Sequence, residues 1–139
     1  MSHMFDNCKS LTKLNIDNFQ TNNVKNMSGI FQNCSALLDL SINVDTKKVE
    51  DISYMFDNCE SLINLDIYNF NTTNVIDMSH MFSKLRSLTQ LNISNFNTEN
   101  VVDMSYMFHN CDLLQKLNVT NFKTHKTVDM SYKFCNCVL

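Results

Sequence analysis

The sequence predicts an α/β repeat solenoid, a right-handed coil with one short parallel strand and one short helical turn in each repeat of about 26 residues. Two recurring features predict this fold, and both keep the same period. A leucine stands two residues before a β-branched residue at Leu14, Leu40, Leu65, Leu91 and Leu117. A phenylalanine that follows Met-x-x-Met, or a close variant, recurs at intervals of 26, 25, 26, 26 and 26 residues: Phe5, Phe31, Phe56, Phe82, Phe108 and Phe134. We expect residues 1–139 to form a single solenoid of about five repeats, as a segment of a longer array.

The strand of each repeat is predicted by alternation of polar and apolar side chains. In residues 90–94 this alternation places Leu91 and Ile93 on one buried face. Leu88 precedes Leu91 by three residues, which gives the L-x-x-L-x-L spacing typical of leucine-rich repeats. Stacked repeats would place neighbouring strands ~4.8 Å apart in a parallel ladder, so each repeat position becomes a column of residues.

The helical turn is predicted by a change in apolar spacing. Met104, Met107 and Phe108 follow the i, i+3, i+4 pattern of a helix face, and Asp103 stands where a helix cap is expected. The chain has one glycine and no proline to make bends. Because asparagine tolerates left-handed backbone angles, we expect Asn110 and its equivalents to turn the chain.

Composition excludes several classes of function. A net charge of −3 and a pI near 5.7 give no electrostatic reason to expect nucleic acid or an anionic membrane as a partner. No run of residues approaches the roughly 18 apolar residues of a membrane span, so membrane insertion is not expected. The first five residues already belong to a repeat, and no signal peptide is recognisable in them.

The sequence carries no catalytic signature, and we predict neither enzyme activity nor a cofactor. Phosphate-binding loops, H-E-x-x-H and nucleophile-elbow motifs are missing. Asp77, Ser79 and His80 look like a catalytic triad, but the residues aligned with His80 are Gly29, Tyr54, Tyr106 and Tyr132. We therefore interpret His80 as a variable surface residue.

Two groups of side chains are candidate metal sites. The cysteine column consists of Cys8, Cys34, Cys59, Cys111 and Cys137, with Leu85 in the remaining repeat, and the leucine indicates buried, reduced thiols. The alternative there is a zinc site made by His109, Cys111, Cys135 and Cys137. The acidic column consists of Asp51, Asp77, Asp103 and Asp129, for which helix capping is preferred and a calcium ladder is the alternative.

A threonine row also recurs, at Thr21, Thr46, Thr72, Thr98 and Thr124. An exposed row of this kind is compatible with ice binding, although a single row is weak evidence for it.

The recurring string Phe-x-Thr-x-x-Val-x-x-Met-Ser-x-Met-Phe-x-x-Cys-x-Ser-Leu spans Phe70 to Leu88, with Leu85 in place of the cysteine. It resembles the BspA-like leucine-rich repeat surface proteins, which carry the mycoplasma-lipoprotein type of repeat. The resemblance implies adhesion to host proteins or other cells, and a location at the cell surface or outside the cell. The chain shows no export signal and no anchor that would support this location.

The candidate binding surface lies on exposed, variable columns. One polar column on the strand face consists of Lys13, Asp39, Asn64, Gln90 and Lys116, and Tyr68 is the aromatic residue of that face. A second candidate is an aromatic ridge made by Tyr54, His80, Tyr106 and Tyr132, since aromatic residues are enriched in binding hot spots. These rings could instead cover the Met and Phe side chains beneath them.

Together these patterns predict a non-catalytic protein-binding module of the adhesion or host-interaction type, with an unidentified protein as its ligand. The alternative is an intracellular scaffold that self-associates end to end, because a solenoid without caps exposes apolar edges.

Overall fold

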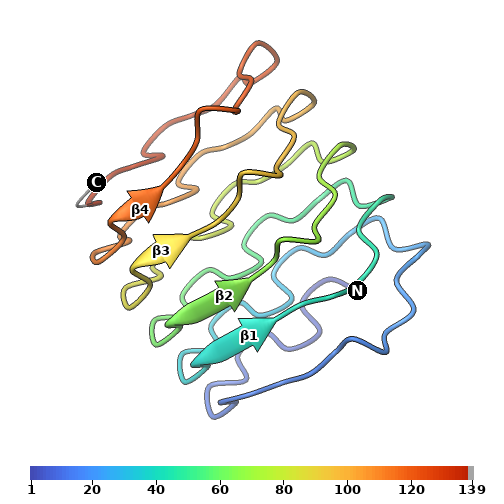
Figure 1. Cartoon of the computed structure of the whole chain (residues 1–139), viewed down its shortest axis with the longest axis vertical. Helices are drawn as coiled ribbons and strands as arrows, with labels where there is room; N and C mark the ends of the chain where they lie inside the picture. Colours follow the sequence, from blue (N-terminus) through green and yellow to red (C-terminus); the bar gives the residue numbers. More distant parts are fainter. Residues whose placement is uncertain (138–139) are drawn as a thin grey trace.

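The computed structural model describes residues 1–137, and in it successive repeats lie side by side in parallel register. Leu40 lies opposite Leu65, and Leu91 lies opposite Leu117. The four strands follow one another along one side of the molecule (Figure 1). Their bounds are β1 (Asp39–Ser41), β2 (Asn64–Asp66), β3 (Gln90–Leu91) and β4 (Lys116–Leu117).

The predicted α/β leucine-rich-repeat-like solenoid is wrong. Residues 1–137 contain no helix, and their strands form two separate two-stranded parallel sheets, β1–β2 and β3–β4. Within this part of the chain no strand pairing joins β2 to β3, so the continuous strand ladder that the repeats predicted does not form. None of the described residues belongs to a helix that could cross a membrane.

Left-handed residues explain why the predicted helical turn is a run of tight turns instead. In the repeat that contains Phe108, Tyr106 has a φ of 55° and Asn110 a φ of 56°. A residue with positive φ cannot continue a right-handed helix. Met104, Met107 and Phe108 are nevertheless fully buried, at 0% exposure each. The apolar spacing therefore predicted burial correctly and the backbone conformation incorrectly.

Backbone amides in these turn segments alternate between two kinds of partner. The N–H of Tyr54 donates to the carbonyl of Ser79 at 2.9 Å, and that of Phe56 donates to the carbonyl of Met81 at 3.0 Å, both in the next repeat. The N–H of Asp57, which follows Phe56, donates within its own turn to the Tyr54 carbonyl at 3.1 Å. The cross-repeat bonds replace the hydrogen bonds along a helix, which leaves the backbone satisfied without one.

The core is a set of columns that run through all the repeats. Fully buried phenylalanines occupy its centre, with neighbouring rings stacked 5.5–5.9 Å apart: Phe31, Phe56, Phe82 and Phe108. Val44 is 7% exposed and fills the place that Phe70 and Phe96 take in other repeats. The stretch from Phe31 to Phe56, which has the 25-residue interval, therefore keeps its core closed although it is one residue shorter than the others.

Four of the five threonines in the row are buried and only Thr124 is exposed, which overturns the ice-binding alternative. Thr21, Thr46, Thr72 and Thr98 are each at most 3% exposed. The Thr98 hydroxyl donates to the Lys123 carbonyl at 2.9 Å and accepts from the Lys123 N–H at 2.8 Å. The row therefore joins neighbouring repeats and presents no regular face to solvent.

The prediction that asparagine turns the chain is confirmed. Positive φ angles of 56–63° occur at Asn7, Asn33, Asn58, Asn110 and Asn136. Side-chain amides of this column also bond across repeats, as between Asn58 Nδ2 and Asn33 Oδ1 at 3.0 Å. The same backbone angle at Tyr54, His80, Tyr106 and Tyr132 was not predicted, because ring side chains rarely adopt it.

Candidate binding surface

The strand face holds a hollow of about 830 Å³ that crosses all four strands. Its lining includes four of the five residues in the predicted strand-face column, namely Asp39, Asn64, Gln90 and Lys116. Lys13, the fifth, does not line it. Tyr68 also lies outside the lining and is 65% exposed. We call this feature the strand-face hollow. It gathers the candidate column because the strands that carry these residues lie in parallel register.

Charge is distributed unevenly along the strand-face hollow. Asp39 and Asp66 lie on β1 and β2, and Lys116 lies on β4. Asn64 donates its side-chain amide to the Asp39 carboxylate, which orients both groups. No hydrogen bond to another described residue engages the side chains of Gln90 or Lys116. These two side chains are therefore unpaired within residues 1–137.

The predicted aromatic ridge is a continuous stack of rings. Tyr54 and His80 lie 4.4 Å apart, His80 and Tyr106 lie 4.6 Å apart, and Tyr106 and Tyr132 lie 4.8 Å apart, with interplanar angles of 10°, 8° and 16°. Inner rings such as His80 and Tyr106 cover each other's faces, so a partner could reach only their edges. This geometry favours the structural interpretation of the ridge over the binding one.

Burial sets the protonation behaviour of this stack. Desolvation lowers the pKa of His80 from its ordinary value of 6.5, and the nearby Asp57 carboxylate opposes that effect only in part. Desolvation also raises the pKa of Tyr54, with smaller contributions from Asp57, Asp77 and Asp103. Tyr54 and His80 are therefore uncharged at neutral pH.

The triad-like residues do not form a catalytic arrangement. The Ser79 N–H donates to the Asp77 carboxylate at 2.8 Å, and Ser79 is only 6% exposed. The His80 ring is held between two tyrosines. No hydrogen bond joins Ser79 to His80 in residues 1–137.

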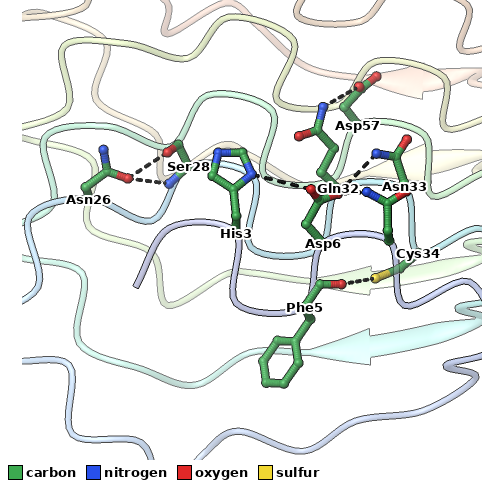
Figure 2. A network of polar contacts seen from close by, with 10 residues as sticks. His3, Phe5, Asp6, Asn26, Ser28, Gln32, Asn33, Cys34 and Asp57 are labelled. Atoms are coloured by element: carbon green, nitrogen blue, oxygen red, sulfur yellow. Dashed lines mark hydrogen bonds and ion pairs between the residues drawn. The ribbon is translucent and has the colours of Figure 1, made fainter.

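The acidic column is engaged in local turns. In each repeat a carboxylate oxygen, or the amide oxygen of Asn26, accepts the N–H of the serine two residues later, at 2.7–2.9 Å. Figure 2 shows this contact for Asn26 and Ser28. The side chains therefore have the local capping role expected of them, although they cap turns and not helices.

The cysteine column lies where predicted, with Cys34, Cys59 and Cys111 buried. The Cys34 thiol donates to the Phe5 carbonyl of the preceding repeat at 3.1 Å, as Figure 2 shows. Burial raises the pKa of Cys34 to about 11 and that of Cys111 to about 12, so these thiols stay protonated and can donate. Among residues 1–137, no group of three or more His, Cys, Asp or Glu side chains is placed to hold a metal ion.

Sequence reasoning missed two further features. A second hollow is lined in part by Lys48, Ile76, Val102 and Lys126. The sequence feature that could have predicted it is an apolar residue at an outward-facing repeat position. A buried polar column contains Asp57, Ser83 and His109, each with one side-chain atom that has no hydrogen-bond partner in the described part of the chain. The Asp57 oxygen that lacks a hydrogen bond lies 3.7 Å from the Lys84 ammonium, within ion-pair distance.

Comparison with known proteins identifies a family. The family described as "Mycoplasma protein of unknown function, DUF285" matches residues 1–61 and 40–138. This match confirms the mycoplasma part of the resemblance. It carries no BspA or leucine-rich repeat name. No curated protein and no solved structure gives a significant match.

Proposed function

The chain belongs to the DUF285 family, and on that premise we propose that it is a non-catalytic protein-binding module that works in cell-surface adhesion or host interaction. The strand-face hollow carries the proposal. It is a broad surface with an apolar floor and polar side chains that differ from repeat to repeat, on a framework whose buried columns hardly change. Such variation over a constant core is typical of repeat proteins that bind other proteins.

Two further observations support the proposal. The recurring motif from Phe70 to Leu88 resembles that of BspA-like leucine-rich repeat surface proteins. Gln90 and Lys116 also offer unpaired donors and an acceptor over a row of leucines. Polar groups of this kind provide specificity while the apolar floor provides contact area.

The proposal is tested by adhesion of protein-coated beads to cultured epithelial cells. We expect beads that carry this chain to bind, and beads that carry a Gln90→Arg, Lys116→Glu double variant to lose most of that binding. A matched control makes the same two exchanges elsewhere, at the exposed residues Gln20 and Lys9. Equal adhesion of both double variants would exclude the strand-face hollow, and no adhesion of the unaltered chain would exclude the adhesin function.

Location is tested separately on the source cells. We expect protease treatment of intact cells to release peptides from this chain, identified by mass spectrometry. Peptides that appear only after lysis would contradict a surface location and favour an internal role.

The alternative function is an intracellular scaffold that self-associates end to end. The last described repeat exposes apolar side chains whose equivalents in its neighbour are buried, and these are the side chains that such contacts would use. Phe134 is 41% exposed and Met130 is 47% exposed, whereas Phe108 and Met104 are each 0% exposed. Sedimentation over a range of concentrations tests it, with Phe134→Asp expected to abolish any concentration-dependent growth.

A further inference from the structure

A second hollow, of about 600 Å³, shares no lining residue with the strand-face hollow. Ile76 and Val102 form its apolar part, and Lys48 and Lys126 lie along it. We call these four residues the lysine-flanked groove. The strand-face proposal does not use this surface.

The apolar residues of the groove are not required by the core. Ile76 is 46% exposed and Val102 is 39% exposed, whereas the residues just before them, Val75 and Val101, are at most 1% exposed. Cross-repeat hydrogen bonds fix this alternation, since the Val102 N–H donates to the Ile76 carbonyl at 2.8 Å. Inward and outward positions therefore cannot exchange.

Equivalent positions in earlier repeats show that the fold accepts charge there. Lys25 and Glu50 occupy the same outward position as Ile76 and Val102, and they form an ion pair at 2.8 Å. Ile76 and Val102 are nevertheless apolar, and each lies between two neighbouring repeats. Exposed apolar side chains at a position that tolerates charge indicate a surface that contacts an apolar partner.

The charges around the groove are not balanced. Glu50, the acidic residue of the lining, is already paired with Lys25. The Lys48 ammonium bonds only to the Asn23 side-chain oxygen at 2.7 Å, and the Lys126 ammonium bonds only to that of Asn100 at 2.7 Å. Within residues 1–137 neither lysine has a carboxylate at ion-pair distance. Two uncompensated positive charges therefore border the apolar strip.

We propose that the lysine-flanked groove binds an acidic, apolar segment of a partner protein. Aliphatic side chains of the segment pack on Ile76 and Val102, and its carboxylates pair with Lys48 and Lys126. The net charge of −3 makes a polyanion such as nucleic acid a poor occupant, because long-range repulsion opposes it. A short acidic segment needs only the local field of the two lysines.

The test measures fluorescence anisotropy of a short labelled peptide of alternating glutamate and valine, mixed with the whole chain. We expect it to bind, and peptides of alternating lysine and valine or of glutamate and serine to bind at least several-fold more weakly. A Lys48→Glu, Lys126→Glu double variant should weaken binding by roughly tenfold, since it replaces two attractive charge pairs at exposed positions with repulsive ones. An Ile76→Ser, Val102→Ser double variant should weaken it similarly. Added salt should weaken it too, because the Debye length falls from about 10 Å at 0.1 M to about 3 Å at 1 M.

Lys116→Glu provides the control, because it reverses a charge in the strand-face hollow and should leave the peptide affinity unchanged. Thermal melting of every variant verifies that it is folded. The proposal is overturned if the glutamate–valine peptide binds no tighter than the lysine–valine peptide. It is also overturned if Lys116→Glu abolishes binding while the Lys48 and Lys126 exchanges do not, since the peptide would then occupy the other surface.

Discussion

The repeat that contains Phe108 and the last described repeat, which contains Phe134, share one backbone conformation but differ in the burial of their apolar side chains. Tyr106 and Tyr132 have φ angles of 55° and 54°. Phe108 is 0% exposed and Phe134 is 41% exposed. Hydrogen bonds within the turns and to the neighbouring repeat therefore maintain the conformation even where apolar cover is incomplete. We infer that hydrogen bonds determine the conformation of each turn, whereas burial of apolar side chains provides its stability.

The difference extends to a charged residue in the core column. Lys133 takes the place that Met107 holds in the preceding repeat, and it is only 8% exposed. Its ammonium lies 3.3 Å from the Met104 sulfur and 4.7 Å from the centre of the Phe122 ring. No carboxylate in residues 1–137 pairs with it, and burial lowers its pKa below the ordinary 10.5.

The largest expected effect compares the same truncation in the two kinds of repeat. Phe82→Ala removes a ring that is 0% exposed and stacked on both sides, so it should cost roughly 3–5 kcal/mol of unfolding free energy. Phe134→Ala removes a ring that is already 41% exposed and should cost well under half as much. Urea denaturation measures both, and equal losses would contradict a separate source of stability.

Replacing the buried lysine should have the opposite effect on stability and raise the unfolding free energy. Lys133→Met restores the residue of the neighbouring repeats and should raise the unfolding free energy by roughly 1–3 kcal/mol at neutral pH. The folded-state pKa of Lys133 is lowered, so its penalty is complete below that pKa and disappears as the pH rises towards 10.5. The stability difference between the two proteins should therefore shrink in alkaline solution. Lys9→Met, at an exposed position, is the control and should change little.

A smaller effect is expected from the threonine row. Thr98→Val keeps the shape of a fully buried side chain but removes both hydrogen bonds to Lys123, which should cost roughly 1–2 kcal/mol. Thr127→Val restores the valine found at Val101 and removes one hydrogen bond, from a partly exposed hydroxyl to the Val101 carbonyl at 3.1 Å, so it should cost less than Thr98→Val. A similar loss from both substitutions in thermal unfolding would show that the last repeat depends on its hydroxyl as well.

The smallest effect concerns pH and the aromatic stack. The folded-state pKa of His80 is lowered, so its neutral form stabilises the fold above pH 6.5, and this contribution is lost as the pH falls below that value. His80→Tyr keeps a ring in the stack, as Tyr54 and Tyr106 do, and removes the titrating group. Melting temperature between pH 5 and 7.5, about the range in which histidine titrates, should fall less steeply on acidification for this variant. Parallel curves would exclude His80 as a source of the pH dependence.

Much of the fold could be predicted from the sequence because the period selects the buried columns. The phenylalanine, methionine and cysteine columns are buried where the pattern placed them, and asparagine adopts the left-handed angles. The helical turn could not be predicted correctly, because the spacing of Met104, Met107 and Phe108 suits a turn that closes every four residues as well as a helix. The left-handed residues and the cross-repeat hydrogen bonds distinguish the two, and those bonds join residues about 25 positions apart.

The candidate surface was predicted in part for the same reason. Equivalent strand residues were expected to lie together, and Asp39, Asn64, Gln90 and Lys116 do so in the strand-face hollow. The pattern could not predict that Lys13 and Tyr68 stay outside it, since the extent of a hollow depends on local shape. The pattern also could not predict that the rings of the aromatic ridge would stack on one another, which covers their faces.

The alternating use of backbone amides also bears on how genes for such chains can change. Each turn segment donates backbone hydrogen bonds to the following repeat and accepts equivalent bonds from the preceding one. Gaining or losing a whole repeat therefore leaves donors opposite acceptors. Losing one residue inside a turn segment would instead put every later donor out of phase. The unit with an interval of 25, from Phe31 to Phe56, is short near Val44, which lies outside the turn segment. Copy number can therefore drift over generations while the phase of each unit is held fixed.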